Sequence, residues 1–357
     1  MSFIAQLEPD GLIEAFLAQP PLGFEVERSP QGMPCFVAPF DLLTTADDAL
    51  RRRVASLPLY SLWGRLLRWR TRFAGTTVSE YAPLPAEVEP AALARGLRQV
   101  YGRDCRLLIV KDIAQDSPLL DPAANAHARA FAEACRREGF VLLEGQALAW
   151  VPIDFASIDD YLARQSYSRR KNIRRKLRSR ADLTVETLRT GAPCFSDETV
   201  FARFHALFDN VYEQSEIHFD RLSADFFRRI LRDADSGGVV FVYRHQGEMI
   251  GWNLCYEHGG KLIDKYVGFA YPQARDHNLY FVSWMHNLDY ARERGLSHYV
   301  AGWTDPEVKA FLGASMTFTR HAVYARNPLL RWLLKRLGGH FEGDRQRIAG
   351  LESSHDE

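Results

Sequence analysis

A strand–helix–strand pattern occurs twice in this chain, and no other feature of the sequence limits the fold as strongly. The first copy combines an apolar run at 105–113, a helical pattern at 121–139 and a second apolar run at 140–153. The helical pattern begins at an Asp-Pro pair and ends at Gly139, with basic residues in its last turn, as helices commonly do. We therefore expect a βαβ unit whose two strands pair in parallel.

The second copy lies in the other half of the chain. Three strand-like runs fill 239–269, and the pairs Gln246-Gly247 and Gly259-Gly260 separate them, as hairpin turns do. A helical pattern at 279–295 and an apolar run at 296–303 follow. The two helical patterns end in the similar sequences CRREG and ARERG, which suggests a structural repeat.

Length and composition agree with two domains. With 357 residues, of which 46% are hydrophobic, the chain can bury more than one core. We place the first domain at 1–155, the second at 156–326, and an amphipathic helix with a polar tail at 327–357. The predicted fold class is α/β, with each domain a mixed, mostly antiparallel sheet flanked by helices.

One dense block of positive charge is unusual here, because the chain as a whole has 45 basic and 45 acidic residues. From Arg169 to Arg180, eight of the twelve residues are Lys or Arg. On a helix, Arg170, Arg174 and Arg178 share one face, and like charges at this spacing repel one another. We expect the block to contact phosphate groups, with a solvated helix face as the alternative. The balanced total charge argues against a general nucleic-acid coat protein.

The remaining signals exclude several classes. The five cysteines have no disulfide or zinc-ligand spacing, so the sequence predicts no metal site and a reducing compartment. We find no secretory signal and no apolar run long enough to span a membrane, which favours a cytoplasmic protein. Two patterns rich in Leu, Trp and Arg, 57–73 and 327–337, predict helices. Such helices could make a peripheral membrane contact, although packing between domains is the favoured interpretation.

The segment 261–296 resembles the acyl-CoA-binding core of the GNAT superfamily. In that family a strand ends in a glycine-containing loop that cradles a pyrophosphate at the N-terminus of a helix. The stretch from Arg275 to Tyr280 occupies the matching register, with Asn278 and Tyr280 where the family has small residues. The residues that we assign to donor binding are Arg275, Asn278, Leu279, Tyr280, Arg170, Arg174 and Arg178.

Two further stretches resemble the Fem-type branch of this superfamily, which includes FemAB-like and BioF2-like sequences. Val308-Lys309, followed by Phe311-Leu312-Gly313, stands where members carry an aromatic-Lys pair before a glycine element. The sequence YSRRKNIRRKLR is similar to a basic helix that many members carry at the start of the second domain. The resemblance covers roughly residues 105–328 and implies tandem GNAT-like domains, the first of them degenerate.

The resemblance also implies catalytic roles. Acyl transfer to an amine passes through an oxyanion that a cation stabilises, and Lys309 stands where Fem-type enzymes carry a lysine for this purpose. The alternative is a surface lysine paired with Asp305 or Glu307. Asp264 and Tyr266, on the expected central strand, are candidates for handling the proton of the amine. Asp264 could instead pair with a neighbouring cation.

We therefore expect an N-acyltransferase that moves an acyl group from an acyl-CoA to the amino group of a small molecule or peptide. An aminoacyl-tRNA, the donor of Fem-type enzymes, is the alternative, and it makes tRNA a partner. Either donor is a co-substrate, and we expect no tightly bound cofactor. A different class also stays open, namely a non-catalytic protein that binds a phosphorylated ligand.

Overall fold

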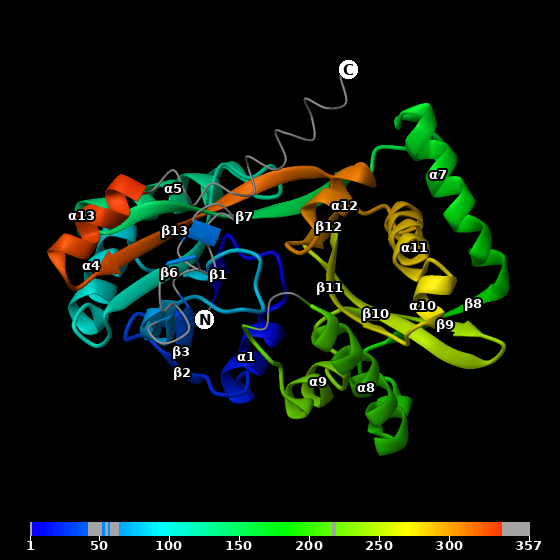
Figure 1. The fold of residues 1–357 in the computed structure, drawn as a ribbon, viewed down its shortest axis with the longest axis horizontal. Helices are drawn as coiled ribbons and strands as arrows, with labels where there is room; N and C mark the ends of the chain where they lie inside the picture. The colour runs from blue at the N-terminus through cyan, green and yellow to red at the C-terminus, as the bar shows by residue number, and fades with distance from the viewer. Residues whose placement is uncertain (1, 42–51, 54–55, 58–63, 216–218, 338–357) are drawn as a thin grey trace. The chain divides into compact units, whose positions relative to one another are not determined.

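The computed structural model describes residues 2–41, 52–53, 56–57, 64–215 and 219–337 (Figure 1). It divides into two compact units whose chain segments interleave. Unit 1 comprises Met1–Gln6, Gly23–Leu148 and Met316–Glu357, as far as these are described, and unit 2 comprises Leu7–Leu22 and Ala149–Ser315. The predicted domain boundaries at residues 155 and 326 do not coincide with the limits of these interleaved segments.

Unit 1 is built on a sheet with the strand order β2-β3-β4-β6-β13-β7, and β1 pairs with β5 separately. Its strands are β1 (Phe3–Ile4), β2 (Glu25–Arg28), β3 (Pro34–Asp41), β4 (Arg68–Ala74), β5 (Leu84–Pro85), β6 (Leu107–Ala114), most of β13 (Ser315–Ala325) and the first part of β7 (Val141–Pro152). Its helices are η1 (Gly64–Leu67), α4 (Pro90–Tyr101), α5 (Pro122–Arg137) and α13 (Pro328–Leu337). The predicted helices at 121–139 and 327–337 are confirmed as α5 and α13.

Two predictions for unit 1 are wrong. The expected parallel pairing of β6 with β7 does not form, because β13 lies between them and runs antiparallel to β6. Because β13 lies about 200 residues after β6 in the chain, a local sequence pattern cannot predict that it pairs there. The second error concerns 57–73, where 58–63 lie outside the described residues and 68–73 form β4 instead of a helix. There Arg68, Arg70 and Arg72 alternate with less exposed residues, which is the period of a strand.

Unit 2 has the strand order β7-β12-β11-β10-β9-β8, beginning with the last residues of β7. Its other strands are β8 (Leu183–Arg189), β9 (Gly238–His245), β10 (Glu248–His258), β11 (Lys261–Phe269) and β12 (His298–Gly302). Its helices are α1 (Asp10–Ala18), α6 (Ile158–Ala163), α7 (Tyr167–Leu177), η2 (Arg178–Asp182), η3 (Pro193–Ser196), α8 (Glu198–Gln214), α9 (Ala224–Leu231), α10 (Gln273–Asp276), α11 (Leu279–Glu293) and α12 (Pro306–Phe311).

The predicted second strand–helix–strand copy is confirmed in unit 2. Both hairpin turns have positive φ at their central residues, 51° and 86° at Gln246 and Gly247 and 54° and 70° at Gly259 and Gly260. After the hairpins, α11 connects β11 to β12, which pair in parallel. In Figure 1, α8 and α9 cover one face of these strands and α11 covers the other. The fold class is confirmed, because each unit is a mixed, mostly antiparallel sheet flanked by helices.

Candidate functional site

The candidate site of unit 2 lies where β11 and β12 separate. Their parallel pairing joins only Lys261–Ile263 to His298–Val300. Beyond these residues β12 ends at Gly302, whose φ is +79°, and β11 continues alone on this side. A strand that loses its neighbour presents its backbone and side chains to whatever lies in the opening. The polar side chains discussed next come from this part of the sheet.

A β-bulge in β11 determines which side chains face the opening. Asp264 pairs with Cys255 and Tyr266 pairs with Leu254, so Lys265 is an extra residue. In a regular strand Asp264 and Tyr266 would share one face. The extra residue turns them apart, and the Tyr266 ring lies 5.3 Å from that of Phe227 on α9, whereas Asp264 faces α11. The structure therefore does not bring these two predicted residues together.

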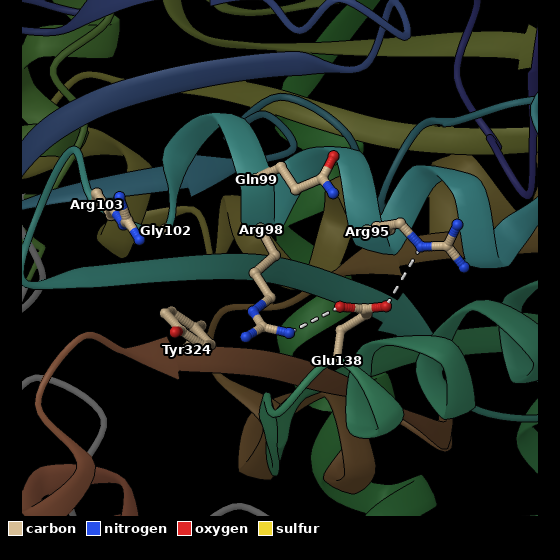
Figure 2. A pocket seen from close by; sticks show the side chains of 7 residues that line it. All are labelled: Arg95, Arg98, Gln99, Gly102, Arg103, Glu138 and Tyr324. Atoms are coloured by element: carbon tan, nitrogen blue, oxygen red, sulfur yellow. Dashed lines mark hydrogen bonds and ion pairs between the residues drawn. The ribbon is translucent and has the colours of Figure 1, made fainter.

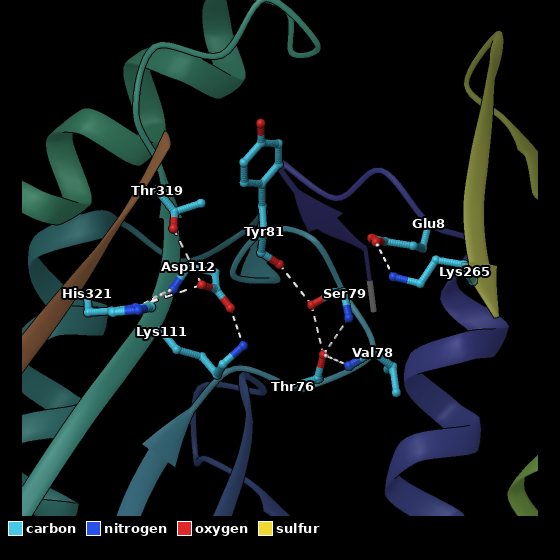
Figure 3. Close-up of polar contacts among 10 residues, drawn as sticks. All are labelled: Glu8, Thr76, Val78, Ser79, Tyr81, Lys111, Asp112, Lys265, Thr319 and His321. Carbon is cyan, nitrogen blue, oxygen red and sulfur yellow. Dashed lines mark hydrogen bonds and ion pairs between the residues drawn. The ribbon is translucent and has the colours of Figure 1, made fainter. Parts of the chain in front are cut away.

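The extra residue, Lys265, forms an ion pair with Glu8. Its ammonium group lies 3.2 Å from the carboxylate of Glu8, and both side chains are almost fully buried (Figure 3). Glu8 belongs to the short segment of the N-terminal region that is part of unit 2. The alternative interpretation, in which Asp264 pairs with a neighbouring cation, is therefore not realised with Lys265, which pairs with Glu8.

Three hydrogen-bond donors hold the Asp264 carboxylate. Asn253 Nδ2 donates to Oδ1 at 2.6 Å, and Tyr299 Oη and Asn287 Nδ2 donate to Oδ2 at 2.7 and 3.3 Å. Asn287 also donates to Asn253 Oδ1 at 2.7 Å, which closes a network across β10, β11, β12 and α11. Burial raises the pKa of Asp264, and the hydrogen bonds and the charge of Lys309 oppose this shift only in part.

Lys309 lies beside this network. It comes from α12 and is 4% exposed, so the alternative of a surface lysine does not hold. A Cβ atom added at Gly302 would lie 3.9 Å from Lys309 Nζ and 3.9 Å from the backbone oxygen of Asp264. The ammonium group is thus held over the end of β12, next to Asp264. The structure brings together two of the three predicted catalytic residues.

The predicted donor-binding loop has a different form from a glycine cradle. The short helix α10 occupies its first half, and Asn278 adopts a left-handed conformation with φ of +50° directly before α11. Leu279 is fully buried against Gly251, so its side chain belongs to the core. Arg275 donates to Gln214 and lies over the ring of Tyr271.

The phenol of Tyr280, in the same loop, lies within electrostatic range of Asp305 and Asp264. Burial raises the pKa of its phenol, and the negative charges of Asp305 and Asp264 add to the shift. The phenol therefore stays protonated and can donate a hydrogen bond near the Asp264 network. Asn278 and Tyr280 stand in this loop where the family carries small residues.

The basic helix is α7, and the side chain of Ser166 caps its N-terminus. Of the three predicted arginines, Arg174 forms an ion pair with Asp159 at 2.7 Å, and Arg170 donates to the carbonyl of Ala163 at 3.3 Å. Arg178 and Arg174 line a pocket of about 480 Å³ that also contains the carboxylates of Asp159 and Asp289. This face of α7 already has acidic and carbonyl partners from unit 2.

Two other cations of α7 lie nearer the candidate site. Arg169 is 5.7 Å from the ring centroid of Phe311 on α12, and Lys176 Nζ is 3.5 Å from that of Phe281 on α11. They flank the buried Ile173 on the inner face of the helix. These two cations were not among the predicted residues, although their spacing of seven residues around an apolar position indicates a face turned inward.

Three further residues of the site, Asn253, Asn287 and Tyr299, were not predicted from the sequence. All three are buried polar residues within otherwise apolar strands or helices, such as the run MIGWNLCY around Asn253. A polar residue inside an apolar run was the signal that could have identified them, because a buried amide needs hydrogen-bonding partners.

Among the described residues, no cluster of His, Cys, Asp and Glu could hold a metal ion, and no helix is long and apolar enough to cross a membrane.

Residues 167–310 match the family described as "Acetyltransferase (GNAT) domain". Among solved structures, the C-terminal domain of a protein described as a lysylphosphatidylglycerol synthetase from Agrobacterium fabrum is 13% identical, with 91% of this chain and 93% of that chain covered and a TM-score of 0.52. L-PGS from Bacillus licheniformis is 12% identical, with 94% of this chain and 98% of that chain covered and a TM-score of 0.52. FemX is also 12% identical, with 90% of this chain and 97% of that chain covered and a TM-score of 0.50. No curated protein sequence matches the chain.

At these identities the structural likeness concerns the fold, and it extends over almost the whole chain. The matched domain, which is described as an acetyltransferase, defines the class of protein as an acyltransferase. More particularly, residues 167–310 form a GNAT acetyltransferase domain, and the fold of the chain is similar to that of FemX.

Proposed function

We propose that unit 2 transfers an acyl group from an activated, phosphate-bearing donor to an amino group. The observation that carries this proposal is the buried Lys309, next to the Asp264 network at the point where β11 and β12 separate. An ammonium group held in this position, away from bulk water, is placed to stabilise an oxyanion that develops beside it.

The reaction proceeds by attack of the amine nitrogen on the acyl carbonyl carbon. A C–N bond forms, the carbonyl oxygen becomes an oxyanion, and the bond to the leaving sulfur or oxygen of the donor then breaks. Lys309 stabilises the oxyanion. The amine must also lose a proton, and Asp264, whose raised pKa makes it a stronger base than an exposed carboxylate, is the candidate acceptor.

The first candidate donor is an acyl-CoA. The matched GNAT domain, whose description names it as an acetyltransferase, supports this donor. Its pyrophosphate would lie at the N-terminus of α11, where backbone N–H groups and the helix dipole favour negative charge. Tyr280 and Asn278 would then contact the donor from the positions where the family carries small residues.

The second candidate donor is an aminoacyl-tRNA, and a separate observation favours it. Arg169 and Lys176 line the inner side of α7 and extend the positive charge along a helix of 11 residues. A run of cations along a helix suits an extended phosphate backbone better than the compact pyrophosphate of CoA. The similar fold of FemX agrees with this donor.

The experiment that tests the proposal is a turnover assay with acetyl-CoA, longer acyl-CoAs and aminoacyl-tRNA, each with a mixture of amines. Release of thiol or deacylation of tRNA that depends on the amines is the expected result. The variant Lys309→Met should lower kcat by about 100-fold to 1,000-fold, as loss of one oxyanion donor does elsewhere. A thermal-shift titration with the same donors measures binding separately, with about 2.7 kcal/mol of stabilisation at 100 times Kd.

The matched control is Lys261→Met, because Lys261 lies on the same strand as Asp264 and donates to Gly259 in the hairpin turn. This variant should keep full activity. If Lys309→Met also keeps full activity with a donor that the protein uses, Lys309 is not the oxyanion cation. If donors stabilise the protein but none is turned over, the non-catalytic binding hypothesis replaces the enzyme.

A further inference from the structure

Unit 1 contains a pocket that is rich in arginine and remote in sequence from the residues discussed so far. Figure 2 shows Arg95, Arg98 and Arg103 around a pocket of about 490 Å³, with Glu138 as the acidic residue of its lining. Glu138 accepts a hydrogen bond from Arg98 at 3.0 Å and lies 3.7 Å from Arg95. The lining thus has one carboxylate for three guanidinium groups, and the pocket keeps a positive charge.

An aromatic side chain connects this pocket to the last described helix. The ring of Tyr324 lines the pocket, and the guanidinium group of Arg98 lies 5.6 Å from its centroid. The guanidinium group of Arg331, which comes from α13, lies 4.8 Å from the same centroid. A fourth arginine thus joins the cluster, and α13 begins beside the pocket.

The helix α13 exposes an apolar row. Leu329, Trp332 and Leu333 are 69%, 54% and 42% exposed, and their spacing of three and four residues places them on one side of the helix. Lys335 and Arg336 follow in the last turn. A row of large apolar side chains beside cations is typical of a helix that lies in the interface of a membrane.

We propose that α13 and the arginine pocket bind the surface of an anionic phospholipid membrane. The side chains of Leu329, Trp332 and Leu333 enter the boundary between headgroups and acyl chains. The guanidinium groups of the pocket contact lipid phosphates, since an anionic surface complements their charge. With 10 residues, α13 is long enough to lie on a membrane and too short to span one.

A nucleic acid fits this surface less well, because a phosphate backbone offers nothing to cover two leucines and a tryptophan. The apolar row therefore distinguishes a lipid surface from a polyanion that would satisfy the arginines alone. This proposal concerns unit 1 and does not depend on acyl transfer by unit 2. An experiment can therefore contradict the membrane proposal without affecting the proposal of acyl transfer, and the reverse.

The test is co-sedimentation of the full chain with vesicles of phosphatidylcholine alone and with vesicles of equal parts phosphatidylcholine and phosphatidylglycerol. We expect binding to the anionic vesicles that weakens as salt is added. The double variant W332S/L333S should lower the partition coefficient by about tenfold or more. The double variant R95Q/R103Q should lower it by about fivefold for each arginine at low salt, with a smaller effect at high salt.

Two controls match these changes at other exposed positions. Leu22→Ser removes an exposed leucine of unit 2, and Arg129→Gln removes an exposed arginine of α5 that pairs with Asp116. Both should bind vesicles like the unaltered protein. Equal binding to neutral and anionic vesicles, or unchanged binding of W332S/L333S, overturns the proposal. Binding of total tRNA that R95Q/R103Q abolishes, with no vesicle binding, assigns the pocket to nucleic acid instead.

Discussion

At the scale of single residues, Asp264 is the centre of the candidate site. Its carboxylate accepts hydrogen bonds from two amides and a phenol, and all three donors are themselves buried. Removal from water nevertheless outweighs these bonds and raises the pKa of Asp264. An acid with a raised pKa in the folded state is stabilising when protonated, so its contribution has a defined dependence on pH.

We predict that Asp264→Asn gains stability relative to the unaltered protein as the pH rises. The contribution of Asp264 is fully present below its ordinary pKa of 3.8 and is lost as the pH rises through the raised pKa of the folded state. The asparagine carries no charge at any pH and does not share this loss. Denaturant unfolding of both proteins between about pH 4 and 8 measures the difference.

The sign of this trend is the decisive result. A variant that becomes less stable relative to the parent as the pH rises would show that the network favours the carboxylate, with a lowered pKa. In that case Asp264 would be a weak base, and its proposed role as proton acceptor would have to be abandoned.

At the scale of elements, the two units share one structural feature, an extra residue in a strand that precedes a helix. In unit 2 the bulge in β11 precedes α11, and in unit 1 the ladder between β6 and β13 is irregular opposite His321. At this place in β6, Asp112 has a φ of +61° and its backbone N–H donates to His321 Nδ1 at 3.1 Å (Figure 3). Both strands thus carry an extra residue before the connection to their helix, which agrees with a repeat.

The two faces of α7 lead to a prediction about donor binding. Replacing Arg169 and Lys176 by Gln removes the two cations that lie against α11 and α12. Replacing Arg170 and Arg174 removes the same charge from the face that already has partners in α6. We expect the first double variant to bind the donor more weakly and to reduce the slope of log K against log salt by about 0.7 to 0.9 for each lost contact.

A binding titration at several salt concentrations compares the two double variants. Circular dichroism first establishes that both are folded. If the slope is unchanged when Arg169 and Lys176 are replaced and reduced when Arg170 and Arg174 are replaced, the arginines predicted from the sequence contact the phosphates.

At the scale of the whole molecule, the units are not consecutive pieces of chain. Unit 2 includes Leu7–Leu22, which lies far in sequence from the rest of that unit. Helix α1 packs against α9, the backbone N–H of Leu22 donates to the carbonyl of Arg221, and Glu8 pairs with Lys265. The last contact ties this segment to the bulge in β11, immediately next to Asp264.

We predict that Lys265→Met destabilises the protein by about 3 kcal/mol or more, because it leaves the buried Glu8 carboxylate without its cation. The double variant with Glu8→Gln should recover much of this loss, since neither residue then carries a buried charge. Denaturant unfolding of the two single variants and the double variant gives the coupling free energy. A coupling near zero would mean that the pair does not hold the N-terminal segment to unit 2.

Several features follow from the sequence alone, and they share a local cause. The hairpin turns at 246–247 and 259–260 depend on residues that tolerate positive φ, and the helices α5 and α7 depend on Asp121 and Ser166 as caps. Each of these signals acts within a few residues of the chain. The position of Lys309 and Asp264 in one site could also be anticipated, through the resemblance of short motifs to a family.

Only the tertiary structure decided how distant segments combine. The entry of β13 between β6 and β7, the extra residue in β11 and the role of Glu8 all arise from contacts between segments far apart in sequence. The bulge illustrates the reason best. One additional residue reverses the face of every side chain after it. Asp264 and Tyr266, which a regular strand would place on one face, therefore lie on opposite faces of β11.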